Sequence, residues 1–309
     1  MTVREHTTDL DPLAAFQHHL DDPEVSEIMV LHGGAVWIET PDGLVPSGRI
    51  DADEVGLCLE LLARTSGRRL DLLSPVLDCV LADGTRICAV IPPVAHGGPV
   101  LSVRRFRRSI LPLAAFGSPA TTAVVGRLVE ERRNVLVSGA TSTGKTSLVS
   151  SVSRLFAEHE RVVCAEDTAE LRFVHPHVVR LQTRPAGVDG RGEVTLQHLV
   201  RASLRLRPDR LVVGEVRGSE AIDMLLALAA GHRGCWATVH ARSAPDAVGR
   251  IRSLVLRDAP QWSDSAVDDL VENSVDAVVH LDRDPDGRRR ITGILERDND
   301  RRLVPVRPS

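Results

Sequence analysis

The chain has 309 residues, of which 43% are hydrophobic, 26% charged and only 3% aromatic, which suits about two globular domains and excludes a disordered or fibrous protein. Acidic residues outnumber basic ones by 42 to 38 and Tyr is absent, so neither bulk positive charge nor base stacking favours a nucleic-acid partner. The 5 cysteines are scattered without a C-x-x-C pair, which excludes a disulfide framework and a zinc ribbon.

Residues 1–108 are expected to form an N-terminal α+β domain. The first residues carry charge and no apolar segment, so no signal peptide is expected, and no stretch is apolar and long enough to span a membrane. The elements expected in chain order are a short helix from Asp11, strands at 28–31 and 35–38, a helix at 51–65 opened by a capping box, strands at 76–82 and 86–91, and a strand at 100–106.

Residues 109–120 contain prolines and a glycine and are expected to be a linker to a second domain at 121–309. In this second domain, strands alternate with helices, which predicts a parallel sheet covered by helices. The expected strands are 135–137, 161–165, 211–213 and 236–239, and the expected helices are 144–157, 195–205, 221–230 and 246–256.

A phosphate-binding loop is predicted where the first of these strands meets its helix. The pattern G-x-x-x-x-G-K-[ST] runs from Gly139 to Thr146, and Lys145 is the only lysine in a chain with 37 arginines. Backbone N–H groups of such a loop cradle phosphates, the lysine reaches the β- and γ-oxygens, and the Thr146 hydroxyl ligates Mg²⁺. A Gly/Ser/Thr-rich turn with an incidental lysine is the alternative. The predicted nucleotide-contacting residues are Gly139, Ala140, Thr141, Ser142, Thr143, Gly144, Lys145, Thr146 and Ser147.

Carboxylates and histidines follow other strands of the expected sheet. Glu215 follows strand 211–213, where a carboxylate can sit beside Mg²⁺ or orient the attacking water. Glu166 is the acid nearest the end of strand 161–165 and is a second candidate for the metal's water shell, unless this segment is only the acidic start of a helix. His232 and His240 flank strand 236–239 and are candidates for sensing the γ-phosphate or passing a proton, although each can instead be structural.

Together these elements resemble the secretion ATPase superfamily, which powers type II secretion, type IV pili and type IV secretion. Its phosphate loop, acidic box, Gly-Glu-x-Arg strand end and His box can all be matched here, and the resemblance is strongest to the CpaF/TadA-like ATPases of the tight-adherence (Flp) pilus. It spans nearly the whole chain, including segments 25–30, 83–87, 89–93, 102–106, 180–185 and 206–210.

The resemblance implies a RecA-like P-loop motor domain, a smaller N-terminal domain packed over it, ATP bound between them, and a homo-hexameric ring. It also implies that arginines from outside the motor core reach the triphosphate, and Arg86 and Arg104 match the N-terminal positions. Arg180, Arg184 and Arg217 are further candidates, and any of these arginines can instead be a solvated surface charge. Two departures are Ser142, where the family usually has Gly, and Arg242, where it usually has Asn.

The expected function is an ATP-hydrolysing, Mg²⁺-dependent hexameric motor for pilus assembly or secretion. Lys145, Glu215, Glu166, Arg104, Arg86, His240 and His232 are its expected catalytic residues, with Thr146, Glu215 and Glu166 at the metal. The protein is expected to be cytoplasmic and held at the inner face of the cell membrane through an inner-membrane platform protein. The alternatives are a conjugation or type IV secretion ATPase that moves DNA or effector proteins, a nucleotide-gated scaffold without turnover, and a helicase-like motor, which the scarcity of aromatic residues disfavours.

Overall fold

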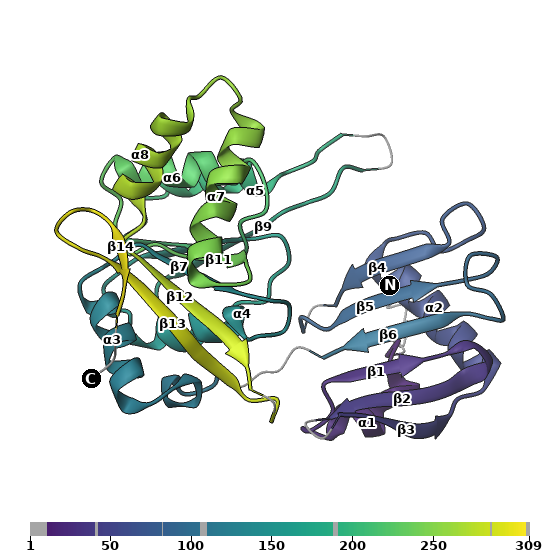
Figure 1. The fold of residues 1–309 in the computed structure, drawn as a ribbon. Helices are drawn as coiled ribbons and strands as arrows, with labels where there is room; N and C mark the ends of the chain where they lie inside the picture. The colour runs from purple at the N-terminus through teal and green to yellow at the C-terminus, as the bar shows by residue number, and fades with distance from the viewer. Residues whose placement is uncertain are drawn as a thin grey trace, which may run out of the picture. The chain divides into compact units, whose positions relative to one another are not determined.

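The computed structural model describes residues 11–40, 43–81, 83–105, 110–187, 191–284 and 286–306. Expectations for residues 1–10 and 106–109, which include the absence of a signal peptide and the start of the linker, lie outside this part of the chain. Two compact units make up the chain, residues 1–108 and 109–309 (Figure 1), and each is described by itself.

Unit 1 is a six-stranded antiparallel sheet with the strand order β3-β2-β1-β6-β5-β4. Its core is built from the inward side chains of all these strands except β3 and from the buried face of helix α2, whose Asp51–Glu54 capping box forms as expected. The strands are β1 (Glu27–Val30), β2 (Ala35–Thr40), β3 (Gly43–Arg49), β4 (Val76–Val80), β5 (Arg86–Val90) and β6 (Val100–Arg104), and the helices are α1 (Gln17–Asp21) and α2 (Ala52–Ser66).

Unit 2 contains an eight-stranded sheet with the order β14-β13-β12-β7-β11-β10-β8-β9. The six strands from β12 to β9 pair in parallel, and β13 and β14 add an antiparallel edge. The strands are β7 (Val135–Gly139), β8 (Val162–Glu166), β9 (Val178–Gln182), β10 (Arg210–Val213), β11 (Trp236–His240), β12 (Ala277–Arg283), β13 (Arg289–Arg297) and β14 (Leu303–Pro305).

Helices cover both faces of this sheet. Side chains alternate along each strand, so Leu136 of β7 packs into one hydrophobic cluster while Val135 and Val137 pack into another. The first cluster takes side chains from α5 (Leu196–Arg205), α6 (Glu220–Ala229), α7 (Ala244–Asp258) and α8 (Asp264–Ser274), and the second from α3 (Pro119–Glu130) and α4 (Lys145–Val152). The predicted α/β class with a smaller N-terminal α+β domain is confirmed.

Several elements differ from the expectation. Residues 113–116 of the expected linker form a 3-10 helix, η3 (Leu113–Phe116), because Phe116 is fully buried in the second cluster, and α3 begins at Pro119. Strand β3 was not expected because Pro46 and Gly48 interrupt it, which an edge strand tolerates. Strand β13 was not expected either, because charged residues at both ends weaken its apolar pattern.

Candidate nucleotide-binding site

The phosphate loop lies at the carboxyl end of β7, between β12 and β11 in the sheet. All five residues of β7 are buried, and α4 begins at Lys145 directly after Gly144. Gly144 has φ +98° and Ser142 has φ +63°, so the loop turns twice through the left-handed region that glycine favours. Ser142 therefore adopts the strained conformation where the family usually has glycine. This curled loop ahead of a helix N-terminus suits an anion.

Lys145 is folded along this loop and is only 9% exposed. Its Nζ donates hydrogen bonds to the carbonyl oxygens of Gly139 at 3.0 Å and Ala140 at 2.9 Å. Burial lowers the pKa of Lys145, while the negative charges of Glu215 and Glu170 oppose this shift. The ammonium thus lies inside the loop, within the electrostatic range of two carboxylates that come from two other strand ends.

Thr146 faces Glu170. Its hydroxyl lies 3.4 Å from Glu170 Oε2, whereas the Glu166 carboxylate is buried and accepts hydrogen bonds from the backbone N–H groups of Glu170 and Leu171 at 2.9 and 2.7 Å. Burial raises the pKa of Glu166, and these two N–H groups and Arg180 partly offset the rise. The structure therefore places Glu170 beside the predicted metal ligand Thr146, and Glu166 beneath the segment that carries Glu170.

Glu215 lies just beyond the end of β10 and is partly exposed. Its carboxylate forms an ion pair with Arg217 of the same turn. Glu220 is buried and accepts hydrogen bonds from the backbone N–H groups of Arg217 and Gly218 at 2.5 and 2.7 Å. This bonding holds the turn at the start of α6, so Glu215 has a defined place at the carboxyl edge of the sheet.

Gly214 precedes Glu215 where β10 passes Glu166. A Cβ atom at residue 214 would lie 2.9 Å from Glu166 Cγ and 3.4 Å from Glu166 Cα. Glycine at this position therefore allows the end of β10 to approach the buried acid of β8.

We expect Gly214→Ala to destabilise the protein by about 1–3 kcal/mol, because the added methyl group displaces Glu166 or the backbone of β10. Gly249→Ala in α7 is the matched control, since a Cβ at residue 249 meets no atom within 4 Å, and it should leave the protein as stable or slightly more stable. Urea unfolding of both variants checks this. Equal stability of the two variants would show that the close approach is unimportant.

The structure separates the two predicted histidines. His240 ends β11 and lies opposite Gly139 in the β7–β11 register, so it is at the edge of the sheet that carries the phosphate loop. His232 precedes β11, at the opposite edge: its ring lies 3.1 Å from the Ala227 carbonyl oxygen near the end of α6, and its own carbonyl accepts a hydrogen bond from Asn134 before β7. His232 thus lies at the edge away from the phosphate loop of its own subunit, because a parallel strand enters the sheet there. Its catalytic role stays a prediction.

A third histidine lies behind the loop and was missed by sequence reasoning. His280 of β12 is buried, and its Nδ1 lies 2.9 Å from the hydroxyl of Ser138, the residue before Gly139. Burial lowers the pKa of His280, and the positive charge of Lys145 adds to this while Asp282 and Asp246 oppose it. The apolar run around His280 was the signal that could have identified this strand.

The candidate arginines lie in both units. Arg86 of β5 and Arg104 of β6 are directly opposite each other in unit 1. Arg180 of β9 lies 3.5 Å from Glu166, Arg184 donates to the Gly192 carbonyl at 2.8 Å, and Arg217 pairs with Glu215. Arg180 and Arg217 thus each contact one of the acidic residues near the loop.

The residues around the loop fit a nucleotide with Mg²⁺. Among the described residues, no group of three or more His, Cys, Asp or Glu side chains is suited to hold a metal ion. Mg²⁺ at a phosphate site typically takes one or two protein ligands and completes its shell with water and phosphate oxygens. The Thr146 hydroxyl, with Glu170 next to it, matches this donor set.

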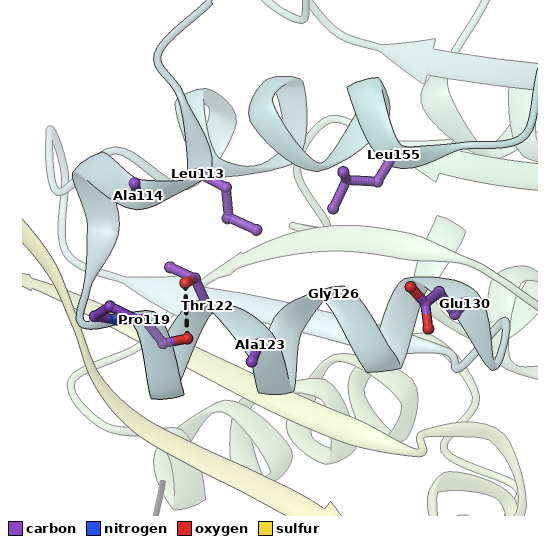
Figure 2. Close-up of a pocket in the computed structure, with 8 residues that line it drawn as sticks. All are labelled: Leu113, Ala114, Pro119, Thr122, Ala123, Gly126, Glu130 and Leu155. Atoms are coloured by element: carbon purple, nitrogen blue, oxygen red, sulfur yellow. Dashed lines mark hydrogen bonds between the residues drawn. The ribbon is translucent and has the colours of Figure 1, made fainter.

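A groove of about 420 Å³ lies elsewhere, between α3 and the residues around η3 and Leu155 (Figure 2). Its lining is mostly apolar or small, with Leu113, Ala123 and Leu155 facing it, and it includes no residue of the phosphate loop. This groove therefore plays no part in the candidate site. Across the described ranges, no helix is both long and apolar enough to cross a lipid bilayer.

A family model described as "Type II/IV secretion system protein" matches residues 11–304. The chain belongs to this family. Among its relatives are a protein of Mycobacterium tuberculosis named for conjugal transfer, 38% identical over 94% of this chain and 86% of the relative, and the type IV secretion system protein PtlH of Bordetella pertussis, 30% identical over 93% and 94%. As a type II/IV secretion family member, the chain is a P-loop NTPase.

Two solved structures share the fold. The VirB11 ATPase of the Brucella suis type IV secretion system, solved with sulphate, is 26% identical with a TM-score of 0.53 over 94% of each chain. The pilus retraction motor PilT with bound ADP is 18% identical with a TM-score of 0.68, over 94% of this chain and 85% of PilT, and shows the likeness of fold alone. The family resemblance in the sequence is thus confirmed at the level of the secretion ATPases, while the relatives named here carry the names of conjugal transfer and type IV secretion.

Proposed function

We propose that the chain is the ATP-hydrolysing motor subunit of a type IV secretion or conjugal transfer system. The observation that carries this proposal is the convergence of Lys145, Thr146, Glu170 and Glu215 from three strand ends onto one loop, in a secretion-family chain. The names of the relatives from Mycobacterium tuberculosis and Bordetella pertussis support the transport system over the pilus. The motor works as a homo-hexameric ring and meets the membrane through an inner-membrane platform protein.

In the proposed reaction, Lys145 leaves the loop carbonyls and donates to the β- and γ-phosphate oxygens. Thr146 would hold Mg²⁺ with Glu170 on its water shell, and the metal when bound neutralises charge on the transferred phosphoryl group. Glu215 orients and deprotonates the attacking water. Glu166 acts as a positioning residue, because its carboxylate holds the backbone of Glu170.

Two further groups of residues are candidates for the proposed reaction. The directly opposed Arg86 and Arg104 remain the candidates for stabilising the charge of the transition state, since guanidinium groups bind phosphoryl oxygens bidentately. His240 remains a candidate for sensing the γ-phosphate, because it lies opposite Gly139.

Assembly of a tight-adherence pilus is the second candidate function. The sequence segments that resemble the CpaF/TadA-like ATPases favour it, since they extend through both units. In this case the same hydrolysis would drive pilin assembly in place of the transfer of DNA or effector proteins.

Deletion of the gene in its native host tests these two functions. We expect transfer of DNA or effector proteins to fall to background, and the chain supplied in trans to restore it, while the Lys145→Ala chain does not. Loss of surface filaments with unchanged transfer would favour the pilus function. Unchanged transfer and unchanged filaments would contradict both.

A further inference from the structure

A cross-strand pair of arginines lies at the end of the β12–β13 hairpin, the yellow strands of unit 2 in Figure 1. Arg283, the last residue of β12, is the register partner of Arg289, the first residue of β13. The hairpin reaches the phosphate loop because β12 pairs with β7 up to Ser138, one residue before Gly139.

Both arginines contact the phosphate loop. Arg283 Nε donates to the Ser142 carbonyl oxygen at 2.8 Å, and an Arg289 guanidinium nitrogen lies 3.2 Å from the Ser147 hydroxyl. The stem of Arg289 crosses directly over Gly144, where an added Cβ would lie 2.5 Å from its Cδ. The pair therefore touches the loop at its turn and at the start of α4.

This arrangement brings three cationic side chains to one loop. Arg283 and Arg289 contact the loop from the hairpin, and Lys145 lies inside it. Guanidinium groups bind phosphate oxygens bidentately, and the N-terminal end of α4 also attracts negative charge. The loop and the end of the hairpin together therefore favour a phosphorylated ligand.

We propose that Arg289, supported by Arg283, binds the phosphates of a nucleoside di- or triphosphate from within the same subunit. The inference rests on the proposed nucleotide-binding function and adds two cationic side chains to that site, besides Lys145. Lys145 serves the β- and γ-phosphates, and Ser147 lies two residues further along α4, so Arg289 faces the α-phosphate end of the tail. ADP and ATP both carry this phosphate and should depend on Arg289 equally.

Nucleotide titration of purified Arg289→Ala tests this. Loss of a charge-assisted contact should raise the Kd for ADP and for ATP about tenfold each, and raise KM by a similar factor with kcat within about twofold of the parent. Arg289→Lys keeps the positive charge but loses the planar guanidinium group. Its Kd for each nucleotide should lie between that of the parent and that of Arg289→Ala. Arg288→Ala is the matched control, because it removes an exposed charge from the same hairpin, and it should bind like the parent.

The outcomes separate this inference from the proposed function. If the parent chain binds ADP and Arg289→Ala binds it equally tightly, the inference is wrong and the nucleotide site stands. If the parent chain itself binds no nucleotide, the proposed function fails. A lower melting temperature of Arg289→Ala with an unchanged Kd would show a purely structural role and would also overturn the inference.

Discussion

Lys145→Ala should abolish ATP hydrolysis and leave the protein folded. The substitution removes the ammonium that meets the β- and γ-phosphates, and the rate should fall by at least about 10³-fold. The cost to stability should be about 1–3 kcal/mol, because the carbonyl of the buried Gly139 loses a donor, whereas Ala140 is exposed to water. Phosphate release under saturating ATP and Mg²⁺ measures the first effect, and thermal unfolding measures the second.

Lys145→Arg sharpens this test. In a chain with 37 arginines, the loop alone keeps a lysine, and a planar guanidinium does not fit where a compact ammonium lies between two loop carbonyls. We expect Lys145→Arg to be as inactive as Lys145→Ala. Arg154→Ala, which removes an exposed cation just after α4, is the control that should keep full activity. Full hydrolysis by either Lys145 variant would refute the assignment of the loop.

Glu215→Gln should slow hydrolysis by about 10²–10⁴-fold while nucleotide still binds. The amide cannot accept the proton of the attacking water, which is the contribution expected of a general base. The amide oxygen can still accept a hydrogen bond from Arg217, so the turn held by Glu220 should persist. Single-turnover phosphate release, together with the Kd for ADP, separates the loss of chemistry from a loss of binding.

Glu158→Gln, at an exposed acid after η4 (Ser153–Leu155), is the matched control and should hydrolyse ATP like the parent. A Glu215→Gln protein that turns over at the parental rate would remove the proposed base. If the parent binds ATP but releases no phosphate above the level of Glu215→Gln, the nucleotide-gated scaffold becomes the better account.

The phosphate loop could be placed from sequence because its residues are contiguous and their spacing carries the chemistry. Which carboxylate faces Thr146 could not be placed in this way. Glu166 turns beneath the backbone of Glu170 and Leu171, and only the folded loop after β8 brings Glu170 to the threonine. The spacing of acidic residues along this segment does not reveal that Glu170, and not Glu166, faces the threonine.

The positions of the two histidines around β11 depend on the direction of the strand. Both flank the same strand, yet the direction of a parallel strand puts His240 at the phosphate edge and His232 at the other. That distinction was available from the predicted sheet. By contrast, Arg283 and Arg289 flank a charged turn, which gives little strand signal. Like His280, they lie more than 130 residues from the loop in sequence, so spacing does not connect them with it.

Titration calorimetry of the purified chain with ATP and Mg²⁺, run beside Lys145→Ala, tests directly whether the loop around Lys145 binds a nucleotide. We expect the parent to take up one nucleotide per chain with measurable heat and a raised melting temperature, and the variant to show neither. A parent chain that gives no heat and no thermal shift at saturating nucleotide, or a variant that binds as tightly as the parent, would contradict the assignment of the loop.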